Sequence, residues 1–94
     1  MFIGFLTFRD KAKAPDWMAR HNAWLDAGFA RGEIVLSGGL QPGLGGAVIL
    51  TVPDRARAEA VLAEDPFVIH GVVTPELLEV TPGRLAPGLE ALKG

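Results

Sequence analysis

The reactive side chains on which many enzymes rely are scarce in this sequence. Its 94 residues contain no cysteine and no tyrosine, and serine occurs only once, as Ser37. Without cysteine the chain has no disulfides, thiolate metal ligands or thiol nucleophiles. Acid–base chemistry near neutral pH therefore depends on the two histidines, His21 and His70, or on a carboxylate with a shifted pKa.

Long apolar runs and an excess of positive charge are also missing. The longest near-apolar runs, such as Phe2–Phe8, are far shorter than the roughly 20 residues that a membrane helix needs. The N-terminus does not show the basic segment and apolar stretch of a signal peptide. A formal net charge of −2 argues against nucleic-acid binding. We expect a cytoplasmic protein that binds neither membranes nor nucleic acids.

The length and the periodicity of the chain predict one domain of the α+β class. Apolar residues at helical spacing, beginning with Trp17, His21 and Trp24, indicate a first helix that stops at Gly32. The order strand–helix–strand–strand–helix–strand predicts a ferredoxin-like fold, with both helices on one face of a four-stranded antiparallel sheet. The predicted strands are 2–8, 33–38, 45–52 and 77–81, and the predicted helices are 15–32 and 53–64. The secondary structure of 67–73 is left open. The predicted domain covers residues 1–82 and is followed by a tail, 83–94.

The predicted sheet has apolar side chains on both faces. In the first strand, Phe2, Leu6 and Phe8 point one way, and Ile3 and Phe5 point the other way. Two helices cover only one face, and the second would leave a larger apolar patch than a monomer usually exposes. The simplest solution is a homodimer that packs sheet against sheet. Alternatively, the tail folds back over this face, although a dozen residues are too few to cover four strands.

His21 and Asp65 are the candidate acid–base pair. His21 lies on the apolar stripe of the first helix, where its imidazole needs a hydrogen-bond partner. A core histidine bonded to a backbone carbonyl is the ordinary interpretation. Asp65 is the natural alternative partner, since a carboxylate on one ring nitrogen leaves the other nitrogen as a base. Asp65 also precedes Pro66, and this pair is typical of a carboxylate that caps the next helical turn.

Ser37 and Gly38 are the candidate substrate-binding residues. Ser37 ends an apolar strand, and the glycines that follow leave backbone N–H groups accessible. No G-x-S-x-G elbow surrounds Ser37, so we expect it to hydrogen-bond in a pocket wall and not to act as a covalent nucleophile. The spacing of His21, Asp65 and His70 does not match a metal motif, and we expect neither a metal nor a cofactor.

Several segments together resemble the YCII-related domain family. They are His21–Gly28 of the first helix, the strand end Leu36–Gly39, the glycine-rich third strand, and Asp65-Pro66-Phe67 followed by Gly71. The resemblance covers about residues 1–82. It implies a ferredoxin-like fold, dimerisation and similarity to dimeric α/β-barrel proteins. It also implies an active site formed by a helix histidine and the Asp-Pro-Phe aspartate, which match His21 and Asp65.

Two functions are compatible with these residues. In the first, the chain is a small cofactor-independent enzyme in which His21 is the general acid and base and Asp65 orients it. Its reaction would be an isomerisation, an elimination or a similar proton transfer on a small molecule. In the second, the same residues belong to a non-catalytic module that binds a metabolite or serves as a structural dimer. Turnover that depends on His21 distinguishes the first function from the second.

Overall fold

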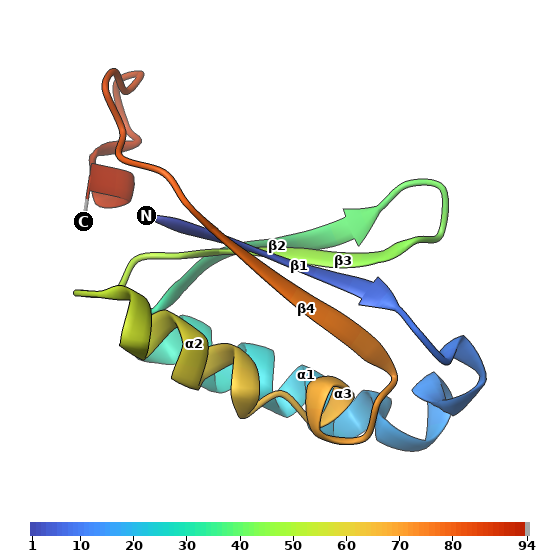
Figure 1. Ribbon diagram of the computed structural model, residues 1–94. Coiled ribbons are helices and arrows are strands. Elements are labelled where there is room, and N and C mark those ends of the chain that lie inside the picture. The colour runs from blue at the N-terminus through green and yellow to red at the C-terminus, as the bar shows by residue number, and fades with distance from the viewer. Residues whose placement is uncertain (94) are drawn as a thin grey trace.

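The computed structural model describes residues 1–93 and consists of one sheet and one layer of helices. Figure 1 shows that the three α-helices lie on the same face of the sheet. The elements are β1 (Phe2–Phe8), the 3-10 helix η1 (Lys11–Lys13), α1 (Ala14–Ala30), β2 (Ile34–Leu40), β3 (Gly45–Leu50), α2 (Arg55–Ala63), α3 (Pro66–Ile69), β4 (Val73–Glu79) and the 3-10 helix η2 (Glu90–Lys93).

The sheet topology confirms the predicted fold class. The strand order is β2-β3-β1-β4, and every neighbouring pair is antiparallel. With α1 and α2 against the sheet, this is the ferredoxin-like α+β arrangement. Within residues 1–93, no helix is long and apolar enough to cross a membrane.

The prediction for the last strand was wrong at its beginning. The strand was expected over 77–81, but β4 starts at Val73 and ends at Glu79. Pro75 lies inside it and is tolerated because β4 is an edge strand, where a missing backbone N–H costs little. Residues 67–73, whose secondary structure was left open, contain most of α3 and the first residue of β4. Asp65 and Pro66 begin α3 in the way their sequence order suggests, as cap and first helical residue.

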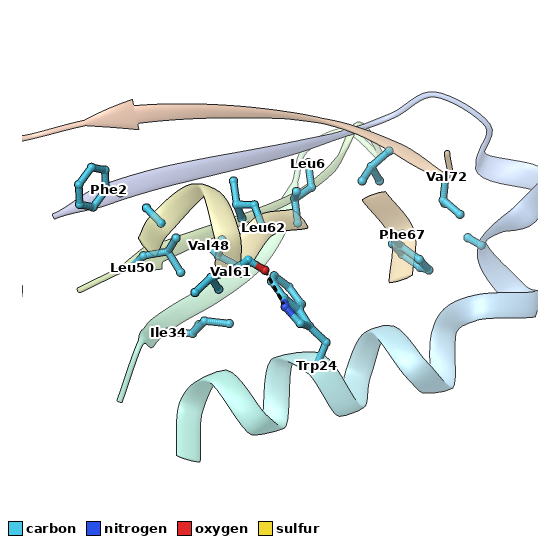
Figure 2. Packing of buried hydrophobic residues seen from close by; sticks show 13 residues of the cluster. Phe2, Leu6, Trp24, Ile34, Val48, Leu50, Val61, Leu62, Phe67 and Val72 are labelled. Atoms are coloured by element: carbon cyan, nitrogen blue, oxygen red, sulfur yellow. Dashed lines mark hydrogen bonds between the residues drawn. The ribbon is translucent and has the colours of Figure 1, made fainter. Parts of the chain in front are cut away.

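The hydrophobic core fills the space between the helices and the sheet. Figure 2 shows Trp24 of α1 reaching across to α2, where its indole Nε1 donates a 3.0 Å hydrogen bond to the Val61 carbonyl oxygen. Leu50, Ile34 and Val48 are almost completely buried. At the end of α1 near β2, Gly28 permits close approach, because a Cβ at this position would lie 2.3 Å from Ile34 Cδ1.

A charged cluster joins the end of α1 to α2 on the surface of the molecule. Arg57 donates to both carboxylate oxygens of Glu33, at 2.6 and 2.8 Å, and Arg31 Nε donates at 2.6 Å. Hydrogen bonding by Arg57, and secondly by Arg31, lowers the pKa of Glu33 from 4.5 to about 2. Arg57 therefore ties α2 to the residue that precedes β2.

The face of the sheet opposite the helices carries an uncovered apolar row. The strand register places Leu36, Ile49, Ile3 and Leu78 beside one another across all four strands. Leu36 and Leu78 are 51% and 48% exposed. The tail after β4 lies beside the N-terminus at one end of the sheet in Figure 1. In the described part of the chain, the tail therefore leaves this apolar row open to solvent.

Candidate functional site

The helix α1 presents His21 to α3 at one end of the helical layer. The imidazole ring stacks on Phe67 with ring centroids 4.0 Å apart and an interplanar angle of 6°. Trp24, three residues further along α1, lies on its other flank with a centroid separation of 5.7 Å. These aromatic contacts leave only 14% of the His21 side chain exposed, so its orientation is fixed by packing.

Asp65 holds His21 from within the core. The Asp65 residue is completely buried, and its Oδ1 lies 2.8 Å from His21 Nδ1. The same oxygen accepts a 2.9 Å hydrogen bond from the Phe67 backbone N–H, which is the N-terminal cap of α3. The two alternatives for Asp65, helix cap and histidine partner, are thus both true in the structure. The ordinary interpretation, in which a backbone carbonyl accepts a hydrogen bond from the His21 ring, is wrong, because Asp65 Oδ1 is the partner of Nδ1.

This arrangement determines which ring nitrogen of His21 has a free lone pair. An ionised carboxylate accepts only, so Nδ1 carries the proton in the bond to Asp65. In the neutral imidazole, Nε2 is then the acceptor. The carboxylate also stabilises the imidazolium that forms when Nε2 takes up a proton. The pair has the geometry of a general acid–base group with an orienting partner.

A cleft of about 210 Å³ opens beside His21, between α1 and the β2–β3 hairpin. Leu6, Met18 and Phe67 form apolar walls, and His21 and Asn22 supply the polar side chains. Gly38, Gly45 and Gly46 form the hairpin side. Gly46 lies on the same face of β3 as Val48, and its lack of a side chain leaves the room that Val48 fills further along that strand. Gly45 must be glycine, because with its φ of 134° a Cβ would lie 2.0 Å from the Leu6 carbonyl oxygen.

Ser37 lies in the wall of a second, smaller cleft. This cleft holds about 140 Å³ and shares Leu6, His21, Gly38 and Gly46 with the first. Ser37 pairs with Val48, whose side chain is buried on the helix-covered face, so Ser37 points to that face as well. The structure therefore brings His21, Ser37 and Gly38 to one side of the molecule, with Asp65 buried behind His21 and not on the cleft surface.

Asn22 and Met18 are cleft residues that sequence reasoning missed. Asn22 lies on the cleft wall with His21. The signal was the spacing of four residues between Met18 and Asn22, which places both on one helix face.

His70 does not join the site. Its ring stacks on Trp17 at 3.4 Å with an interplanar angle of 7°. Across residues 1–93, no three His, Cys, Asp or Glu side chains gather closely enough to hold a metal ion.

The fold and the site define a class of protein: a ferredoxin-like domain in which a partly buried histidine at a cleft contacts a completely buried aspartate. The family model of the YCII-related domain matches residues 3–81. The chain belongs to this family, as its sequence resemblance implied. No curated protein matches the chain.

Proposed function

We propose that the chain is a small cofactor-independent enzyme that moves a proton on a small molecule, as in an isomerisation or an elimination. His21 Nε2 removes and returns the proton, and Asp65 is the positioning residue. Ser37 and the backbone of Gly38 hold a polar group of the substrate. The observation that carries this proposal is the 2.8 Å contact between His21 Nδ1 and Asp65 Oδ1 beside an open cleft.

The chemistry of the cleft supports proton transfer more than covalent catalysis. The serine is not in hydrogen-bond contact with His21, whose Nδ1 is engaged by Asp65 and whose ring stacks on Phe67. The apolar walls exclude part of the water around Nε2, which strengthens electrostatic interactions with a bound substrate.

The test compares two histidine variants on a panel of small lactones and hydroxylated aromatics in D₂O, read by proton NMR. The native chain and His70→Gln should exchange, isomerise or eliminate the same compound. His21→Gln should lose at least about 100-fold in rate, the usual contribution of a general base. Turnover retained by His21→Gln would show that His21 is not the base. Binding of panel members without turnover in the native chain would favour a non-catalytic binding module.

We also propose that two copies associate through the open face of the sheet. The apolar row of Leu36, Ile49, Ile3 and Leu78 crosses the whole sheet and can meet the same row of a second copy across a two-fold axis. A stable dimer buries about 800 Å² on each partner, so the whole open face and its edges would take part in the interface. This surface supports the homodimer expected from the strand pattern.

Light scattering after size-exclusion chromatography tests the dimer. The native chain should have twice the 10.0 kDa mass of one copy. Ile49→Glu places a charge in the apolar row and should give monomers. Phe29→Glu is the matched control, because Phe29 is 44% exposed but lies on α1, in the helical layer. A native monomer at micromolar concentration would refute the dimer.

A further inference from the structure

The cleft beside His21 is built for a ring-sized molecule that carries little positive charge. Its volume of about 210 Å³ exceeds the roughly 150 Å³ that is enough to hold benzene. Phe8, Met18 and Phe67 offer apolar and aromatic contact. No carboxylate is among the lining residues, so nothing in the wall would pair with a cationic group.

One ammonium group lies near Phe8, a lining residue of this cleft. Lys11 Nζ, in η1, is 5.2 Å from the ring centroid of Phe8, which is itself a wall of the cleft. A Cβ built on Gly43, at the tip of the β2–β3 hairpin, would lie 3.5 Å from the same Nζ. Lys11 Nζ therefore lies close both to Phe8 at the end of β1 and to the tip of the β2–β3 hairpin.

Lys11 differs from Lys13 of the same short helix. Lys13 Nζ lies 3.8 Å from Asp10 Oδ2 and 3.5 Å from the His70 carbonyl oxygen. Among residues 1–93, no acidic side chain lies within ion-pair distance of Lys11. The charge of Lys11 is thus available to a ligand, whereas the charge of Lys13 is already partnered.

The charge distribution favours the same kind of ligand. Residues 9–20 hold four basic side chains and two acidic ones, although the whole chain has a net charge of −2. The positive field at this end of an acidic protein attracts anions toward the cleft and raises their local concentration.

We propose that the substrate is a ring-sized carboxylate and that Lys11 is the residue that recognises its charge. The ring lies against Phe8, Met18 and Phe67, with the carboxylate at the rim on Lys11 Nζ and the reacting carbon toward His21. This inference names the substrate class of the proposed enzyme and rests on that function. Lys11 binds and does not take part in the proton transfer.

The test measures the binding of benzoate and of its neutral isostere benzamide to the whole chain by NMR titration, with the His21 ring signals as the readout. The native chain should bind benzoate about three- to tenfold more tightly than benzamide, the range expected for one partly exposed ion pair. Lys11→Gln should remove this preference and leave benzamide binding unchanged. Lys13→Gln, the matched control, should keep the preference. Added salt should weaken benzoate binding and spare benzamide.

Each outcome separates the two proposals. Equal binding of the two probes by the native chain, or an unchanged preference in Lys11→Gln, overturns the assignment of Lys11 and leaves the histidine–aspartate enzyme intact. Binding of neither probe near His21 counts against the cleft as a substrate site, and so against both proposals. Benzoate binding that survives in Lys11→Gln but is lost in Lys13→Gln would place the anion on the wrong lysine and also overturn the inference.

Discussion

The contact between His21 and Asp65 predicts a measurable coupling in the stability of the protein. Asp65 Oδ1 receives two hydrogen bonds, from His21 Nδ1 and from the Phe67 N–H, in a completely buried position. Asp65→Ala removes the cap of α3, worth about 1 kcal/mol, and a hydrogen bond to an ionised group, worth about 1.5–3 kcal/mol. We therefore expect the free energy of unfolding to fall by about 2–4 kcal/mol. That is a large part of the total of roughly 5–14 kcal/mol for a chain of this length.

A double-mutant cycle isolates the part that belongs to the pair. Asp65→Ala, His21→Gln and the double variant are unfolded in urea at one fixed protein concentration, with tryptophan fluorescence as the probe. The losses of unfolding free energy in the two single variants, added together, should exceed the loss in the double variant by about 1–2 kcal/mol. This is because either single substitution already breaks the hydrogen bond between the two side chains. A coupling below about 0.3 kcal/mol would refute the reasoning, since independent sites add to within that margin. His70→Gln combined with Asp65→Ala is the control and should be additive.

Two further predictions concern stability away from the cleft. Glu33→Gln should lower stability by about 1–2 kcal/mol at pH 7. Because the folded-state pKa of Glu33 is lowered to about 2, this contribution is complete above pH 4.5 and is lost as the pH falls toward 2, where urea curves of the two proteins should converge. Gly28→Ala should lower the free energy of unfolding by about 1–3 kcal/mol, since its Cβ would lie 2.3 Å from Ile34 Cδ1. Gly38→Ala, where a Cβ meets nothing within 4 Å, should cost less, and equal losses would contradict the packing argument.

The sequence by itself determined the element order and the two faces of the first strand. Alternating apolar residues in Phe2–Phe8 and helical spacing from Trp17 are local signals, and the structure has both elements. Gly32 has the left-handed φ of 72° that ends a helix, as its position predicted. The start of β4 was missed because Pro75 and Glu76 have poor strand propensity, and their place in the strand comes from pairing with β1.

Only the tertiary structure decided what surrounds His21. Residues 21 and 65 are separated by 44 positions, and no local pattern specifies that the helix cap of α3 also receives an imidazole. The fold brings them together because α1 and α3 pack side by side against the same sheet, which also stacks the ring of His21 on Phe67. The cleft likewise forms only where α1 meets the β2–β3 hairpin, and the position of Lys11 Nζ near Phe8 depends on the same long-range packing. Local chemistry therefore fixed which side chains were available, and the packing of distant elements decided which of them meet.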